Sequence, residues 1–210
     1  MISAGDFWGW FKKNNAKYFF LNQIDNKEEK EKLLNDFLVQ LHQYSDKLFF
    51  EIGGHPDEEQ DLIITAEGNT NYFSKVEELV GQAPRLKDWN IIAFKPPKEF
   101  GFITQYNDIT LDPRQMWFTP LNNPDAPHLI GLKMFLKNFD PKKEQEYLFA
   151  TSIALDNILG EQSNAENIAH IEVENISSKL QEENLIEVSE LPNYIRWAKR
   201  QTDNEPSNQT

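Results

Sequence analysis

The spacing between apolar residues changes near residue 46, and this change constrains the fold more than any other feature of the sequence. Before it, apolar side chains recur every three or four residues, which predicts a helix over about 27–45. Another helix is expected from Asp6, which can cap the aromatic-rich segment that follows it. After residue 46 the period is two, as in strands. The chain must therefore combine a helical part, 6–45, with a sheet.

The order strand, strand, helix, strand occurs twice in the rest of the chain, over about 48–96 and 115–174. Consecutive hairpins favour antiparallel pairing, with helices packed on the sheet. The sequence therefore predicts an α+β fold, with a largely antiparallel sheet built from the two units and two N-terminal helices packed on it. The expected strands are 48–52, 61–67, 90–95, 115–119, 129–136 and 168–173, and the expected helices within the units are 73–80 and 140–159.

A length of 210 residues suits one domain, and we expect residues 1–200 to form a single α+β domain. Residues 201–210 contain no large apolar residue and are expected to form a flexible acidic tail. The first residues lack the basic and apolar stretches of a secretory signal, and no apolar run reaches the roughly 20 residues that span a bilayer. These observations predict a cytoplasmic protein.

The composition argues against several kinds of chemistry. The chain has no cysteine, which excludes disulfides, thiolate metal sites and a cysteine nucleophile. It has 34 acidic and 21 basic residues, a net charge of −13, which disfavours binding to nucleic acid or to an anionic membrane. Neither a glycine-rich phosphate loop nor a hydrolase or metalloprotease motif occurs. We therefore expect no nucleic-acid or membrane partner, no cofactor and no metal.

Three charged residues in apolar strands, Glu51, Glu67 and Lys95, are the first candidates for a functional site. If their strands are adjacent, Lys95 can meet either carboxylate, and the set could supply a general base and a cation that positions an anionic group. A salt bridge on the solvent face explains the same residues and is the favoured interpretation. The catalytic interpretation stays open because Glu is unfavourable in such strands.

His170 and Glu172 are the second candidate, because they share one face of the strand 168–173. A histidine beside a carboxylate can bind a ligand or transfer a proton. A solvent-exposed strand face that carries one His and one Glu is the favoured interpretation here.

Several motifs along the chain form a recognisable set: Phe7-Trp8-x-Trp10-Phe11, Phe50-Glu51-Ile52-Gly53, Leu62-Ile63-Ile64-Thr65-Ala66-Glu67-Gly68 and Ala93-Phe94-Lys95-Pro96-Pro97. This set resembles an uncharacterised family of bacterial cytosolic proteins, over about residues 5–195. The resemblance implies a bacterial, cytosolic protein with a single domain. The family has no established activity, so it assigns no catalytic residue.

Two function hypotheses follow from these features. The first is a non-enzymatic binding protein, of an immunity or regulatory type, whose acidic surface meets a basic protein partner. The alternative is a small-molecule enzyme with acid–base or hydrolytic chemistry that uses Glu51, Glu67 and Lys95. An oligomer-forming structural protein is a third hypothesis, and the sequence leaves the oligomeric state open.

Overall fold

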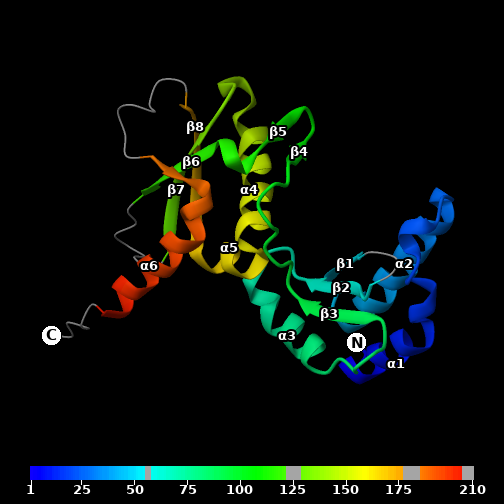
Figure 1. Cartoon of the computed structure of the whole chain (residues 1–210). Helices are drawn as coiled ribbons and strands as arrows, with labels where there is room; N and C mark the ends of the chain where they lie inside the picture. The colour runs from blue at the N-terminus through cyan, green and yellow to red at the C-terminus, as the bar shows by residue number, and fades with distance from the viewer. Residues whose placement is uncertain (55–57, 122–128, 177–184, 205–210) are drawn as a thin grey trace. The chain divides into compact units, whose positions relative to one another are not determined.

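The computed structural model describes residues 1–54, 58–121, 129–176 and 185–204, without the side chains of Asn22 and 202–204. The chain divides into two compact units, Met1–Lys95 and Pro96–Thr210 (Figure 1). This division differs from the single domain expected over 1–200. Its physical reason is visible in the second unit, whose main apolar core is built entirely from residues of that unit. Each unit is described separately below.

The first unit begins with two helices, α1 (Ala4–Asn14) and α2 (Lys27–Tyr44). Ser3 caps α1 instead of the expected Asp6: the Ser3 hydroxyl accepts from the Asp6 amide, and the Asp6 carboxylate accepts from the Ser3 amide. Asn26 caps α2 through its side-chain oxygen. The segment between the two helices contains the short 3₁₀ helices η1 (Asn15–Lys17) and η2 (Leu21–Gln23).

The sheet of the first unit has three strands in the order β1-β2-β3. β1 (Phe49–Gly53) and β2 (Gln60–Thr65) are antiparallel, whereas β3 (Trp89–Ala93) is parallel to β2. The helix α3 (Phe73–Gly81), preceded by the 3₁₀ helix η3 (Thr70–Tyr72), connects these two parallel strands. The parallel pair corrects part of the antiparallel expectation, because a helical crossover returns the chain in the same direction.

The helices of the first unit cover one face of its sheet (Figure 1). Phe50 of β1 and Ile64 of β2 are paired neighbours on this face. The centroid of the Phe50 ring lies 4.0 Å from that of Phe37 in α2. The indole nitrogen of Trp8 in α1 donates to the backbone oxygen of Leu79 in α3 at 2.8 Å. The unit is therefore a two-layer α/β arrangement with an aromatic-rich core.

The main sheet of the second unit has four strands in the order β8-β7-β6-β9. β7 is antiparallel to β6 and parallel to β8, and β9 adds antiparallel to the other side of β6. A separate hairpin, β4 with β5, packs on the helix α4. The elements are β4 (Thr104–Tyr106), β5 (Ile109–Leu111), η4 (Pro113–Gln115), β6 (Met116–Leu121), β7 (Ile130–Leu136), η5 (Pro141–Lys143), α4 (Glu144–Leu159), α5 (Glu161–Asn167), β8 (Ile168–Asn175), β9 (Ile186–Glu187), η7 (Val188–Glu190) and α6 (Leu191–Asn204).

The two strand–strand–helix–strand sets have the same topology. In each, an antiparallel hairpin is followed by a helical crossover to a strand parallel to the second strand of the hairpin. The α+β class is confirmed, and both sets lie where they were expected. The described strands form three sheets instead of one continuous sheet. Within the first unit, the N-terminal helix α2 packs on β1.

The first residues of the expected tail, 201–210, differ from the prediction. Residues 201–204 belong to the end of α6 and are helical, while 205–210 lie outside the described residues. In the part of the chain that the structure describes, no helix has the length and apolarity needed to cross a membrane.

Leu155 lies in the middle of α4 and is fully buried in the core of the second unit. Leu155→Ala should lower the free energy of unfolding by about 2–5 kcal/mol, because it leaves a cavity in a packed core. The measurement is a denaturant titration. Ile153→Ala on the same helix is the control, because Ile153 is 41% exposed and should cost much less. Equal losses for the two variants would contradict the assigned helix face.

Candidate functional site

The structure brings together two of the three residues of the first predicted site. The Nζ of Lys95 lies 3.0 Å from Oε2 of Glu67, and both side chains contact solvent. Both residues were expected within strands, and neither lies in one. β2 ends at Thr65 and β3 ends at Ala93, because Glu67 and Phe94 adopt positive φ angles of 51° and 66° that end the extended backbone.

Glu51 does not belong to this pair. It lies in β1 opposite Ile63 of β2, which precedes Glu67 by four residues in the sequence. A general base formed by two adjacent carboxylates would need both at one place on the sheet. The Glu67–Lys95 contact is therefore an ion pair that connects the ends of β2 and β3, and exposed pairs of this kind contribute about 1 kcal/mol or less to stability.

His170 and Glu172 lie on β8, at one edge of the four-stranded sheet. The ring nitrogen Nε2 of His170 is 3.4 Å from Oε1 of Glu172, and both side chains are exposed. Glu172 also lies opposite Lys133, whose amine pairs with Glu174 at 2.9 Å. This arrangement has the character of a solvent-exposed charged face. Across the described ranges, no group of three or more His, Asp or Glu side chains is placed to hold a metal ion.

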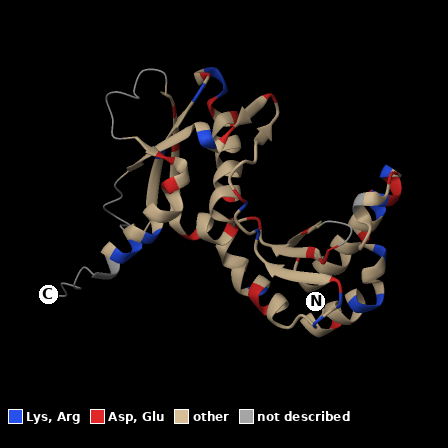
Figure 2. Ribbon diagram, in the orientation of Figure 1, with Lys and Arg blue, Asp and Glu red and all other residues tan. Residues whose placement is uncertain are grey.

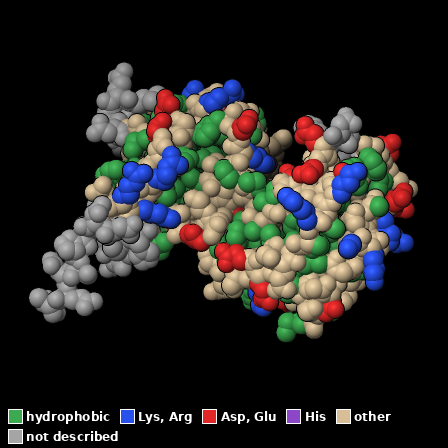
Figure 3. All heavy atoms as spheres, turned by 60° about the horizontal axis from the view of Figure 1, so that its bottom comes forward, with side chains coloured by type: hydrophobic (Ala, Val, Ile, Leu, Met, Phe, Trp, Pro, Cys, Tyr) green, Lys and Arg blue, Asp and Glu red, His purple; other side chains and the backbone are tan. Residues whose placement is uncertain are grey.

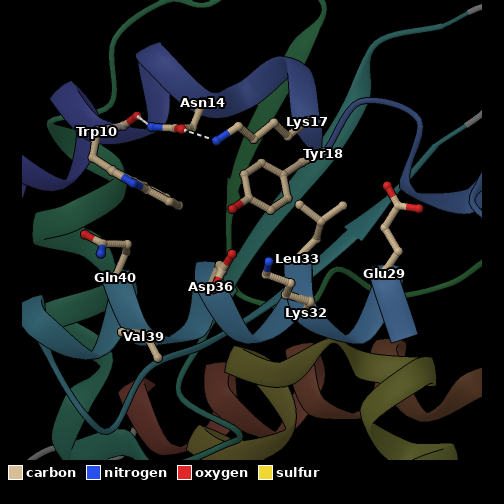
Figure 4. Close-up of a pocket in the computed structure, with 10 residues that line it drawn as sticks. All are labelled: Trp10, Asn14, Lys17, Tyr18, Glu29, Lys32, Leu33, Asp36, Val39 and Gln40. Carbon is tan, nitrogen blue, oxygen red and sulfur yellow. Dashed lines mark hydrogen bonds between the residues drawn. The ribbon is translucent and has the colours of Figure 1, made fainter. Parts of the chain in front are cut away.

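A pocket that sequence reasoning missed lies in the first unit, between the α1–η1 segment and α2 (Figure 4). Its volume is about 480 Å³, within the range of small-molecule sites. The walls combine charges of both signs with an aromatic and aliphatic surface. The lining residues are Trp10, Asn14, Lys17, Tyr18, Glu29, Lys32, Leu33, Asp36, Val39 and Gln40.

Tyr18 projects its hydroxyl into this pocket, toward Asp36 (Figure 4). Only 1% of the residue is exposed. Burial of the ring, with a smaller effect of the nearby Asp36 charge, raises the pKa of Tyr18 to about 12. The phenol therefore keeps its proton at neutral pH and can donate a hydrogen bond to a ligand.

Lys17 approaches the pocket from η1 and is held in place by a neighbour. Its amine donates to Oδ1 of Asn14 at 2.8 Å, and Nδ2 of Asn14 donates to the backbone oxygen of Trp10 at 2.9 Å. Asp36 projects from α2 on the opposite wall (Figure 4). Among the described residues, neither Lys17 nor Asp36 forms an ion pair within 4.0 Å.

An apolar groove of about 400 Å³ lies on another side of α2, next to β1. Leu34 and Leu38, one helical turn apart, form its helical wall, and Phe49 and Phe50 form its strand wall. Phe49 is 38% exposed. Because β1 is an edge strand, the groove runs beside backbone groups that face away from β2.

On the face that Figure 3 shows, the charges do not form one acidic surface. In Figure 3, acidic side chains are scattered among basic, apolar and polar ones on the face that is visible. Figure 2 shows Lys and Arg along α6, where Arg196, Lys199 and Arg200 lie. The net charge of −13 belongs to the whole chain, and α6 is a locally basic segment within it.

The pocket left a weak signal in the sequence. Polar residues at Glu29, Lys32, Asp36 and Gln40 repeat at helical spacing and form a stripe beside the apolar stripe of α2. Such a stripe usually faces solvent. It lines a pocket here because Tyr18, from a separate segment, packs across it.

Comparisons with known proteins found no matching family model, no matching curated protein and no matching solved structure. The resemblance to a bacterial cytosolic family stays a prediction. The functional evidence therefore comes from the fold and from two places in the first unit: the pocket lined by Tyr18 and the apolar groove beside β1.

Tyr18 should make stability depend on pH in the alkaline range. The unfolded chain releases the phenol proton near pH 10, whereas the folded protein retains it until about pH 12. The contribution of the protonated Tyr18 to the free energy of unfolding is complete below pH 10 and is lost as the pH rises through 12. Relative to Tyr18→Phe, the wild type should lose about 1 kcal/mol of unfolding free energy between pH 9 and pH 11. Urea titrations of both proteins measure this difference, and parallel pH profiles would contradict it.

Proposed function

We propose that the chain is a non-enzymatic binding protein, of a regulatory or immunity type, that binds an extended basic segment of a partner protein along the edge of β1. One observation carries this proposal. In the second unit, the strand that corresponds to β1 is β6, and its edge is occupied by the added strand β9. The same topology therefore accepts an antiparallel strand at this position within the molecule itself.

The backbone of β1 is available for such an addition. Among the described residues, its only ladder partner is β2, and no other backbone hydrogen bond involves residues 49–53. An edge strand presents N–H and C=O groups that an incoming strand can pair with, and this main-chain pairing is a common mode of peptide recognition.

The groove beside β1 supplies the apolar contribution. In an added strand, alternate side chains point to opposite faces of the sheet. The side chains on the helical face would lie against Leu34 and Leu38, and those on the other face would lie beside Glu51. An apolar residue at every second position fits the first set of contacts.

Glu51 favours a basic residue in the partner. Its carboxylate is exposed in the middle of β1, and the first unit carries 16 acidic against 11 basic residues. Opposite charges on neighbouring strands stabilise pairing, and like charges oppose it. A second copy that paired antiparallel about Glu51 would place two carboxylates opposite each other, so a basic partner fits this edge better than self-association.

The enzyme hypothesis retains less of its original basis, because only Glu67 and Lys95 of its three residues meet. We therefore prefer binding to catalysis. The proposal also takes the protein to act in the bacterial cytoplasm. The absence of cysteine and the resemblance described above support that location.

The test uses two capped seven-residue peptides that alternate valine with lysine or with glutamate, each carrying a fluorophore. Fluorescence anisotropy should show that the wild-type protein binds the lysine peptide at least about tenfold more tightly than the glutamate peptide, a difference of about 1.4 kcal/mol. Glu51→Lys should reverse this preference. High salt should weaken the preferred complex in both proteins, because exposed charges are screened.

Leu38→Gln should weaken the binding of both peptides, because it removes apolar surface from the groove. Val39→Gln is the control, because Val39 is the next residue along the helix and does not line the groove. Circular dichroism confirms that each variant is folded. The proposal is wrong if neither peptide binds below about 1 mM, or if Glu51→Lys leaves the preference unchanged. Sedimentation that shows a dimer dissociated by Leu38→Gln would assign the edge to a second copy instead.

A further inference from the structure

The pocket between α1–η1 and α2 contains a hydrogen-bond donor that its surroundings do not use. Tyr18 is almost fully buried, yet its hydroxyl opens into the pocket. Within the described chain no hydrogen bond of this hydroxyl is present, although two other buried phenols, Tyr44 and Tyr147, each donate to a backbone oxygen. Because the hydroxyl borders the pocket, it is a donor that a ligand or a water molecule there can use.

The charged groups of this pocket lie on opposite walls. Lys17 and Tyr18 come from the segment after α1, whereas Glu29, Lys32 and Asp36 come from α2 (Figure 4). The amine of Lys17 is oriented by Asn14, and neither Lys17 nor Asp36 is neutralised by an ion pair with a described residue. The pocket thus presents the donors of Lys17 and Tyr18 for an anion on one wall. The other wall presents the Asp36 carboxylate for a cation and also carries Glu29 and Lys32, so its three charges sum to −1.

We propose that this pocket binds a small zwitterion, an amino acid with an apolar side chain. The ligand carboxylate would accept hydrogen bonds from Lys17 and Tyr18, and the ligand ammonium would donate to Asp36. The site is distinct from the β1 edge, and the proposal does not depend on the peptide-binding function.

The requirement for both charges follows from the composition of the walls. A simple anion would gain from Lys17 but would also meet the Asp36 carboxylate, and a simple cation would face the converse repulsion. Charge-assisted hydrogen bonds are the stronger ones, so a ligand that satisfies both walls gains twice, and a ligand with one charge pays for the unmatched wall. This arrangement selects zwitterions over ions of either sign.

The remaining wall is apolar. Trp10, Leu33 and Val39 line the pocket together with the charged groups, and Val39 is 49% exposed. An aliphatic side chain would remove this surface from water. The indole of Trp10 can also attract the ligand ammonium through its ring face.

Isothermal titration with L-leucine, L-leucinamide and N-acetyl-L-leucine tests the proposal on the full chain. L-leucinamide lacks the negative charge and N-acetyl-L-leucine lacks the positive charge, while the side chain is the same in all three. L-leucine should bind with a Kd of about 1 mM or tighter, and each derivative should bind at least about tenfold more weakly.

The variants assign each charge to a wall. In Lys17→Met, the preference for L-leucine over L-leucinamide should fall to the several-fold part that Tyr18 supplies, because the variant removes the charged partner of the ligand carboxylate. In Asp36→Asn, L-leucine and N-acetyl-L-leucine should become similar, because the variant removes the charged partner of the ligand ammonium. Tyr18→Phe should weaken L-leucine several-fold but leave L-leucinamide unchanged.

Matched controls lie on the helices that flank the pocket but outside its lining. Lys12→Met in α1 and Glu31→Gln in α2 should bind L-leucine as the wild type does. The proposal is overturned if L-leucine shows no binding at about 20 mM, roughly twenty times the expected Kd. It is also overturned if the affinity ratios between L-leucine and its two derivatives stay at their wild-type values in Lys17→Met and Asp36→Asn. The exposed positions of Lys17 and Asp36 keep the test independent of any folding defect in Tyr18→Phe. Lysine-peptide binding should be unchanged in all of these variants, so failure of either proposal leaves the other measurable.

Discussion

The ring of Phe37 joins the helical layer of the first unit to its sheet, and both candidate sites depend on this contact. Phe37 is fully buried. Its position fixes α2 between two partners, with Tyr18 at 5.3 Å and Phe50 at 4.0 Å between ring centroids. Three further aromatic contacts connect it to α1, through Phe7, Trp10 and Phe11. Edge-to-face pairs of this kind add to the free energy of apolar burial.

Because α2 is fixed in this way, its two flanks carry different chemistry. The flank near Tyr18 carries Asp36 and forms the polar pocket, whereas the flank near Phe50 carries Leu34 and Leu38 and forms the apolar groove. A change at Phe37 would therefore disturb both sites together. Changes at Asp36 or Leu38 act on one site each, and the proposed experiments rely on this separation.

The features that could be predicted from sequence are those that depend on neighbouring residues. The helix expected over 27–45 spans Lys27–Tyr44, because the spacing that defines its buried face is local. The placement of Glu67 and Lys95 inside strands was wrong, since the positive φ angles of Glu67 and Phe94 are not encoded in alternating hydrophobicity. The parallel ladders were missed for a related reason: periodicity identifies strands but does not specify their partners.

The candidate sites were harder to predict, because contacts between distant segments decide which of the predicted charged residues meet and where the pocket lined by Tyr18 forms. Glu51, Glu67 and Lys95 were selected as charged residues in apolar strands, yet the register of β1 against β2 separates Glu51 from the other two. Tyr18 lies after η1 and packs across α2, a contact that its place in the aromatic-rich segment after Asp6 does not specify. The division into two units was also not apparent, because a chain of 210 residues is compatible with one core or with two.

The addition of β9 to β6 has a consequence for how strongly an external segment must bind. β9 has only two residues, and this is enough because it belongs to the same chain, which presents it to β6 at a high effective concentration, on the order of millimolar. An external segment has no such tether and loses translational freedom when it binds. It must recover that free energy from additional contacts. The groove formed by Leu34, Leu38 and Phe49 lies beside β1 and can supply them.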